Sequence, residues 1–404
     1  MSVPFVDCIG LAGGYSLGAT QAGFELVHRA SIAGGFGDST IRANISGDWD
    51  QDPETEWDSW TPAVAGLLCG TPPCSGFSSL TTRGARGPGA AINKCMWELI
   101  NYAGRCYGTD GKKGPEIVSI ESVQAAFTKG RDLMRAFWEQ LEDDTGLSYE
   151  LHHVLMSGSS IGAAQMRHRY FMVLSRVPFG VDPPSREDLP DQRVVTYRDA
   201  LSDLEGARVQ WESQPYPRDA QTEYQRLLRA DSLTCHQVVG GGVASAAHEV
   251  SKRGWRPGSY LSEAFDELDY HPTKFAGSRD FGTNAMRRGK SSYRGLNWPY
   301  KILPDRPGYV LAGSCSRDFA HWSEHRMLTI RELSRLMGYP DSWEWPHKVT
   351  VAGSQLGKCA PVPSCRWMAT WFMRALEGSP GASGAMIGED EYLHNSTDVY
   401  KDWL

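Results

Sequence analysis

The chain has 404 residues, of which 41% are hydrophobic and 22% are charged, and its formal net charge at pH 7 is -7. This composition is typical of a soluble globular protein, and the length favours two domains or one large domain with an insertion. No apolar run approaches the roughly 18 residues of a membrane-spanning helix, and the first ten residues lack the features of a signal peptide. We therefore expect a cytoplasmic protein without a membrane partner.

The nine cysteines are spread thinly and form no Cys-x-x-Cys pair. We therefore expect free thiols, no disulfide framework and no metal site. The acidic net charge excludes a uniformly basic nucleic-acid-binding protein, but a local basic surface remains compatible with it.

Apolar runs, glycine- or proline-containing turns and amphipathic runs alternate in the first part of the chain. An apolar run before residue 10 leads through glycines into a helical pattern, and a second strand is predicted over about 25–32. Further apolar or helical patterns cover residues 64–70, 93–104, 115–123 and 131–144. Repeated strand, turn and helix predict an α/β fold with a doubly wound, mostly parallel sheet, whose site lies at the carboxyl ends of the strands.

Periodicity weakens over residues 179–318, where Gly, Pro, Ser and Arg accumulate. This region predicts an inserted, loop-rich domain between a first catalytic segment, 1–178, and its continuation, 319–376. Helical periodicity returns at Thr329. Residues 377–404 are Gly/Ser-rich and then acidic, so we expect a loosely held tail.

Within the insertion, residues 271–300 contain six basic side chains but only one acidic side chain, and Tyr and Trp are interspersed among them. The basic residues are Lys274, Arg279, Arg287, Arg288, Lys290 and Arg294. Such a stretch on an acidic chain favours contact with a phosphate backbone, and a solvated surface with chance clustering is the alternative.

Cys74 lies in a Gly-Thr-Pro-Pro-Cys-Ser-Gly turn directly after an apolar run. A thiol on a rigid turn at the edge of a sheet is well placed as a nucleophile, although an isolated buried cysteine is more often structural. Glu121 ends another predicted strand. Arg167 and Arg169 alternate before an apolar run, so both can point to one face. Taken singly, Glu121 and the two arginines are also explained as solvated surface residues.

Six ordered pieces of the chain together resemble the cytosine carbon-5 DNA methyltransferase family. They are DCIGLAGGYSLG from Asp7, GTPPCSGFS from Gly70, IESV from Ile120, GAAQMRHR from Gly162, RMLTIRELSRLMGYPD from Arg326 and QLGKCAPVP from Gln355. The basic insertion lies between the fourth and fifth pieces, where the family has its target-recognition domain. The resemblance implies a Rossmann-like catalytic domain that acts on double-stranded DNA, and we expect a monomer.

The resemblance also implies a role for each candidate catalytic residue. Cys74 would add to carbon 6 of a cytosine flipped out of the duplex, which makes carbon 5 electron-rich enough to take an alkyl group from a sulfonium. Glu121 would share a proton with ring nitrogen 3. Gln165, Arg167 and Arg169 would face the base carbonyl and the phosphates.

An S-adenosylmethionine site is implied around the first two strands. The start of the first helix would receive the polar tail of the cofactor, and Asp48 with Trp49 would bind its adenine. The predicted cofactor-binding residues are Ile9, Gly13, Gly14, Tyr15, Ser16, Ser31, Ile32, Asp48, Trp49, Pro73, Lys358 and Cys359.

Several of these positions depart from the family pattern. The usual Phe-x-Gly-x-Gly is here Ile9, Leu11 and Gly13, and the acid expected after the second strand is Ser31. The family's Glu-Asn-Val and Pro-Cys-Gln have become Glu-Ser-Val and Pro-Cys-Ser.

Lys358 replaces the asparagine that lies near the transferable methyl in the family. An ammonium ~4 Å from a sulfonium is repelled by about 4 kcal/mol at an effective dielectric of ~20, which weakens binding roughly a thousandfold. A carboxylated donor, carboxy-S-adenosylmethionine, would instead be attracted, and the missing acid at Ser31 favours the same donor. We therefore predict carboxymethyl transfer, which gives 5-carboxymethylcytosine. Ordinary methyl transfer, with Lys358 turned to solvent or phosphate, is the alternative.

Two further classes of function stay open. A catalytically idle DNA-binding homologue would have no use for the nucleophile, and an RNA substrate is conceivable because one branch of the family modifies transfer RNA. A restriction companion, a bacteriophage defence against restriction and an epigenetic mark would all share these motifs.

Overall fold

The computed structural model describes residues 2–31, 36–51, 57–77, 87–178, 194–230, 232, 234–237, 243–267, 299–313, 315–378 and 389–394. The chain divides into two compact units. The first unit comprises Met1–Gln192 and Cys359–Leu404, and the second comprises Arg193–Lys358. No helix within the described ranges is both long and apolar enough to cross a membrane.

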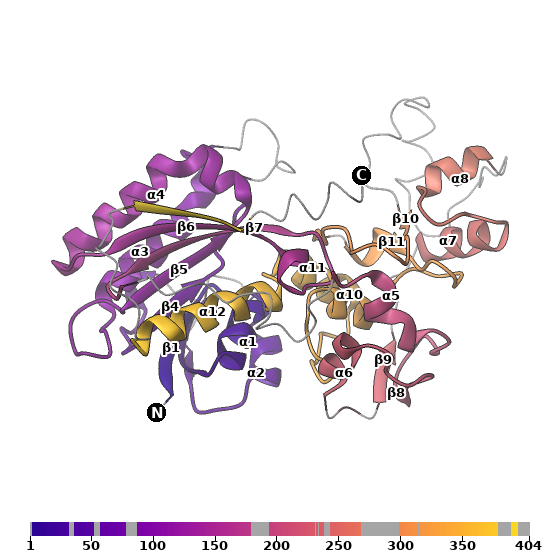
Figure 1. Cartoon of the computed structure of the whole chain (residues 1–404), viewed down its shortest axis with the longest axis horizontal. Coiled ribbons are helices and arrows are strands. Elements are labelled where there is room, and N and C mark those ends of the chain that lie inside the picture. Colours follow the sequence, from indigo (N-terminus) through magenta and orange to yellow (C-terminus); the bar gives the residue numbers. More distant parts are fainter. Residues whose placement is uncertain are drawn as a thin grey trace. The chain divides into compact units, whose positions relative to one another are not determined.

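A sheet of eight described strands, in the order β12-β6-β7-β5-β4-β1-β2-β3, forms the centre of the first unit (Figure 1). Its strands are β1 Val3–Cys8, β2 Phe24–Ala30, β3 Asp50–Gln51, β4 Leu67–Gly70, β5 Ile117–Ser122, β6 Glu150–Ser157, β7 His168–Ser175 and β12 Glu389–His394. β7 is antiparallel to both of its neighbours, β5 and β6, whereas the other neighbouring strands are parallel. The predicted mostly parallel α/β sheet is therefore confirmed.

Helices cover both faces of this sheet (Figure 1). α1 (Gly14–Gln21) packs on α12 (Val362–Leu376), and α3 (Lys94–Arg105) packs on α4 (Gln124–Thr145). Alternate residues of β1, β5 and β7 join side chains of α3 and α4 in a buried hydrophobic core, as the two-residue period of a strand requires. The core therefore fixes which strand residues face each layer of helices.

Two segments extend or differ from the sequence prediction. α4 consists of two helical segments that meet at the non-helical Gly130, and the second begins where the predicted helical pattern begins, at 131, whereas the first, from Gln124, was not predicted. Residues 389–394 form β12, which pairs with β6, so this part of the predicted loose tail is instead a strand of the sheet. The rest of the predicted tail after 378 lies outside the described residues.

The second unit contains short helices and two small sheets. Its main elements are α5 Tyr197–Leu201, β8 Gln210–Pro215, α6 Glu223–Arg229, β9 Thr234–Gln237, α7 Val243–Lys252, α8 Leu261–Glu267, β10 Tyr300–Lys301, β11 Phe319–Ala320, α10 Ile330–Leu336 and α11 Val349–Lys358. The unit continues past residue 318, the predicted end of the insertion, because α10 packs on both α5 and α11.

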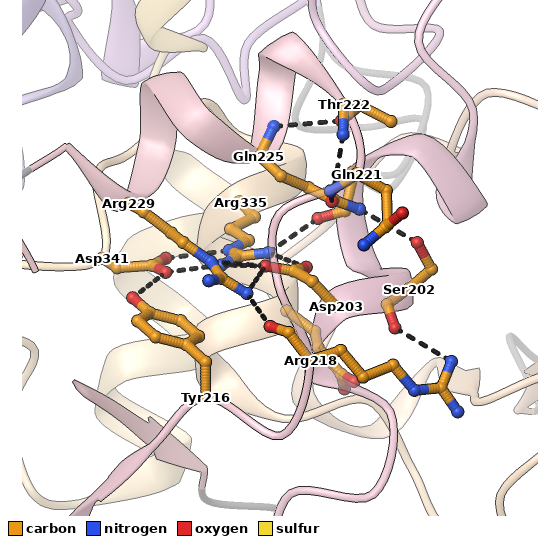
Figure 2. A network of polar contacts seen from close by, with 12 residues as sticks. Ser202, Asp203, Tyr216, Arg218, Gln221, Thr222, Gln225, Arg229, Arg335 and Asp341 are labelled. Carbon is orange, nitrogen blue, oxygen red and sulfur yellow. Dashed lines mark hydrogen bonds and ion pairs between the residues drawn. The ribbon is translucent and has the colours of Figure 1, made fainter. Parts of the chain in front are cut away.

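Arg335 of α10 is the centre of a buried ion-pair network in the second unit (Figure 2). Its guanidinium donates to Asp203 at 2.5 Å and to Asp341 at 2.6 Å. Arg229 donates to Asp203 at 2.8 Å, and the hydroxyl of Tyr216 donates to Asp341 at 2.5 Å. Burial alone would raise the pKa of Asp341, but Arg335 outweighs it and the pKa is lowered. Opposite charges thus tie α6, α10 and the segment after α5 together.

Replacing Arg335 with Met should lower the stability of the second unit by about 3–5 kcal/mol, because two buried carboxylates would lose their central cation. Arg198→Met is the matched control, since Arg198 pairs with Asp305 at the exposed surface. Urea unfolding followed by tryptophan fluorescence measures both. Equal midpoints for the two variants would contradict this role of Arg335.

Candidate active site

β1, β4 and β5 end at the same edge of the sheet. Cys74 lies just beyond the end of β4, and Glu121 is the last but one residue of β5. Because β7 runs antiparallel to β5, its first residues reach this edge, where Arg169 meets Glu121. Strand direction therefore gathers residues that are far apart in the sequence.

Glu121 and Arg169 form a buried ion pair between Oε1 and Nε. The side chains are 7% and 8% exposed, so water screens the pair weakly. Burial raises the pKa of Glu121, although the positive charges of Arg169 and Arg167 oppose the change. Glu121 consequently keeps its proton to a higher pH than an ordinary glutamate, and a protonated carboxyl can donate to a ring nitrogen.

Cys74 is partly exposed, in contrast to the buried Cys69 of β4. Burial of its thiol and the negative charge of Glu121 raise its pKa, whereas Arg169 and Arg167 act in the opposite direction. The thiol is therefore within electrostatic reach of all three charged groups. Protonation of Glu121 would remove one of the causes of the raised pKa and so favour the thiolate, which is the nucleophilic form.

The turn that carries Cys74 is anchored against α4. Phe77 donates its backbone N–H to the Cys74 carbonyl at 3.0 Å, and its buried ring packs against Gly130. A Cβ at Gly130 would lie 2.7 Å from the Phe77 ring, so only glycine allows this approach. The glycine at the kink of α4 thus has a packing reason beside the candidate nucleophile.

Arg167 is buried next to Cys359. Its Nη2 donates to the Cys359 carbonyl at 3.2 Å, and burial with the neighbouring charge of Arg169 lowers its pKa to about 9. The sulfur of Cys359 accepts the backbone N–H of Ala12 at 3.3 Å. Cys359 therefore connects the predicted catalytic arginine to the predicted cofactor turn. Gln165 is fully buried in the same segment.

The turn between β1 and α1 has an unusual backbone. Gly13 has a φ of 90°, but Ile9 and Leu11 also have positive φ values, of 62° and 53°. Left-handed backbone costs a non-glycine residue about 1–2 kcal/mol. The side chains of Tyr15 and Ser16 point into the protein, where they donate to Ser119 at 2.7 Å and to Asp7.

A buried cluster of charged residues adjoins this turn. The sequence analysis did not predict this cluster. Arg29 of β2 is fully buried and donates to Asp7 at 2.5 Å, to Asp38 at 2.7 Å and to the Leu11 carbonyl at 2.8 Å. Asp38 is the first residue of α2 (Asp38–Asn44). The available signal was weak: Asp38 is the first acid after β2, preceded by a glycine-rich run.

Asp38 also changes the interpretation of Ser31. The Ser31 hydroxyl donates to Asp38 Oδ1 at 2.9 Å, and Gln51 donates to Oδ2 at 2.8 Å. A carboxylate therefore lies beside Ser31 after all, and the expectation that this position lacks negative charge is wrong. The chain supplies the charge from a neighbouring helix instead of from the strand end.

The other predicted cofactor residues differ in their surroundings. Asp48 is exposed, whereas Trp49 is buried with the Arg42 guanidinium 3.4 Å from the centre of its ring. Pro73 is half-buried beside Cys74, and Lys358 is an exposed residue at the end of α11. Ile32 and all six basic candidates for DNA contact, Lys274 to Arg294, lie outside the described residues.

Comparison with known proteins gives a consistent assignment. Residues 3–371 match the family model of the C-5 cytosine-specific DNA methylase. The chain is 23% identical to the Type II methyltransferase M.AgeI of Thalassovita gelatinovora, in a match covering 88% of this chain and 96% of that protein. It is 22% identical to M1.HphI of Haemophilus parahaemolyticus, in a match covering 89% and 84%.

A similar fold occurs in a solved structure described as a DNA modification methyltransferase encoded within an E. coli prophage. The TM-score is 0.65 at 16% identity, with 93% of this chain and all of that chain covered. At this identity the likeness concerns the fold alone.

Glu121→Gln removes a negative charge that raises the pKa of the Cys74 thiol, so the thiolate should form at lower pH. We expect the rate of Cys74 alkylation by iodoacetamide to keep rising through pH 9 in the native protein, and to reach its inflection at lower pH in Glu121→Gln. Peptide mass spectrometry measures each cysteine. Cys95 is the internal control, because burial and Glu98 raise its pKa and Glu121 does not. An unchanged Cys74 inflection would contradict the electrostatic coupling.

Proposed function

Because the chain belongs to the C-5 cytosine-specific DNA methylase family and is a DNA cytosine-C5 methyltransferase, we propose that Cys74 is its nucleophile. The observation that carries this proposal is the assembly of a partly exposed thiol, a carboxyl group with a raised pKa and two buried arginines at one sheet edge. A protein that only binds DNA has no use for this combination.

The first chemical step is addition of the Cys74 sulfur to carbon 6 of a cytosine that has left the base stack. Addition moves electrons toward ring nitrogen 3 and makes carbon 5 nucleophilic. Carbon 5 would then take a methyl group from a sulfonium donor, whose carbon–sulfur bond breaks to leave a neutral thioether. Water or another base takes the carbon 5 proton, nitrogen 3 returns its proton to Glu121, and elimination expels the Cys74 sulfur as a thiolate and restores the ring. Each bond that forms to Cys74 is therefore broken again in the same cycle.

Glu121 and the arginines stabilise the charge that this addition creates. The protonated carboxyl of Glu121 donates to nitrogen 3 through one oxygen, while its other oxygen accepts from the Arg169 guanidinium, which keeps the carboxyl in place. Arg167 and Arg169 favour the thiolate of Cys74 before addition. The two arginines outnumber the one carboxylate, so the site suits a developing negative charge.

The first unit offers suitable groups for S-adenosylmethionine, which when bound would supply an electrophilic methyl on its sulfonium. The first amides of α1 have no intrahelical acceptor and suit the carboxylate of its tail. Asp38 brings a carboxylate to the end of β2, where α/β folds bind ribose hydroxyls. We assign Asp38 to that contact in place of Ser31.

Duplex DNA is the proposed substrate, and the second unit is the proposed target-recognition domain. The named relatives are Type II methyltransferases, which favours a restriction companion as the biological role. A monomer in the cytoplasm is part of the same proposal.

The native protein, incubated with duplex DNA and S-adenosylmethionine, should yield 5-methylcytosine in chromatography of the digested nucleosides. Cys74→Ser should abolish the product, because a hydroxyl is a far weaker nucleophile than a thiolate. Glu121→Gln should lower turnover by about 10²- to 10⁴-fold, the usual contribution of a positioned acid.

Cys95→Ser is the matched control, since Cys95 is a partly buried cysteine of α3 away from Glu121, and its activity should be unchanged. Full activity of Cys74→Ser would refute the assignment of the nucleophile.

Lys358 favours a second candidate, transfer of a carboxymethyl group from carboxy-S-adenosylmethionine. Lys358 is an exposed residue that directly precedes Cys359 in the chain, and the sulfur of Cys359 accepts a hydrogen bond from the predicted cofactor turn. A cation at this point of the chain would attract a donor carboxylate. Only Lys358 supports this candidate, because the carboxylate of Asp38 lies beside Ser31 and supplies the negative charge that Ser31 itself does not carry.

Supplying each donor separately distinguishes the two candidates. If Lys358 selects the carboxylated donor, Lys358→Asn should lower 5-carboxymethylcytosine formation at least about tenfold, by loss of a charge-assisted bond, and raise 5-methylcytosine formation. Lys358→Arg, which keeps the charge, is the control. Product with S-adenosylmethionine alone and no effect of Lys358→Asn would remove the carboxymethyl candidate and leave methyl transfer.

A further inference from the structure

Two residues of the turn between β1 and α1 have left-handed backbones although neither is glycine. They are Ile9 and Leu11, and both side chains are buried. In this conformation Cβ crowds the backbone, and a β-branched residue such as Ile is especially disfavoured. Such residues persist only where their surroundings hold them, and they gather at functional sites.

Specific hydrogen bonds hold each of these residues. Ile9 donates its N–H to the Ala30 carbonyl at 2.7 Å and accepts from the Thr71 hydroxyl at 3.0 Å. The carbonyl of Leu11 accepts from Nη2 of Arg29 at 2.8 Å. Arg29 is thus the side chain that restrains Leu11.

Two carboxylates from different elements hold the guanidinium of Arg29 in place. Nη1 donates to Asp7 of β1 at 2.5 Å, and Nε donates to Asp38 of α2 at 3.0 Å. Both the guanidinium and the Asp7 carboxylate are fully buried. A planar group with two charged partners has little freedom, so the direction of its remaining N–H is determined.

α2 begins against the same turn. Gly37, with a φ of 92°, precedes Asp38, and a Cβ there would lie 2.3 Å from the Leu11 carbonyl oxygen. The absence of a side chain at Gly37 therefore lets Asp38, Arg29 and the turn meet.

We infer that Arg29 is a positioning residue for the donor, and that it acts by holding Leu11 in the left-handed conformation that shapes the turn. This inference rests on the proposed function, because it takes the turn to be part of the S-adenosylmethionine site. Arg29 works through the turn: all three of its nitrogens bind protein groups.

Paired substitutions at Leu11 test this inference. Leu11→Gly and Leu11→Ala both remove the leucine side chain, but only glycine adopts the left-handed backbone without strain. Each is made with native Arg29 and with Arg29→Lys, whose single ammonium cannot replace all the bonds of the guanidinium. Calorimetry gives the dissociation constant of S-adenosylhomocysteine, the product form of the donor.

Arg29→Lys should raise this constant by about tenfold or more, and adding Leu11→Gly should recover most of the affinity, whereas adding Leu11→Ala should not. Equal effects of Leu11→Gly and Leu11→Ala on the dissociation constant would overturn the inference.

If Arg29→Lys does not fold, the two Leu11 variants are compared in the protein with native Arg29. Leu11→Gly should then melt at a higher temperature than Leu11→Ala, and the reverse order would overturn the inference. Failure of the native protein to bind S-adenosylhomocysteine would instead contradict the proposed function.

Discussion

The antiparallel direction of β7 is the constraint on which the candidate active site depends. If β7 were parallel to its neighbours, its first residues would lie at the opposite edge of the sheet from Cys74. Because the strand is reversed, Arg169 meets Glu121 at the carboxyl edge, and Arg167 reaches the same group of charges. One change of strand direction therefore creates a buried, positively biased surrounding for a thiol.

The buried charges of the chain follow two different patterns. Arg335 and Arg229 share the carboxylates of Asp203 and Asp341, and Arg29 binds those of Asp7 and Asp38, so the cations of these clusters are matched or outnumbered by carboxylates. Glu121 instead has two arginines near it, and burial still raises its pKa. Structural clusters bury cations among carboxylates that stabilise them. The excess of arginine over carboxylate near Glu121 instead suits negative charge that develops on a substrate.

The sequence predicted the strand ends, and with them the meeting of Cys74 and Glu121. Strand ends are predictable because hydrophobic periodicity is local, and parallel strands bring their ends to one edge. The two arginines were assigned to this site by the family resemblance, because the antiparallel direction of β7 was not predicted. Asp38 and Arg29 were missed because their partnership depends on how α2 folds back onto β1 and β2, which no spacing encodes. The strand β12 was missed because its pairing with β6 joins distant parts of the chain. The basic candidates of the insertion stay predictions.

Trapping with a DNA duplex that contains 5-fluorocytosine tests the central claim most directly. Fluorine at carbon 5 cannot leave as a cation, so an enzyme that has added its thiol and transferred an alkyl group stays bound to the base. The account predicts a covalent protein–DNA complex that requires the donor and is joined through the sulfur of Cys74, as mapped by mass spectrometry of the peptide. A complex joined through another residue, or no complex under conditions in which the native protein modifies unsubstituted DNA, would contradict it.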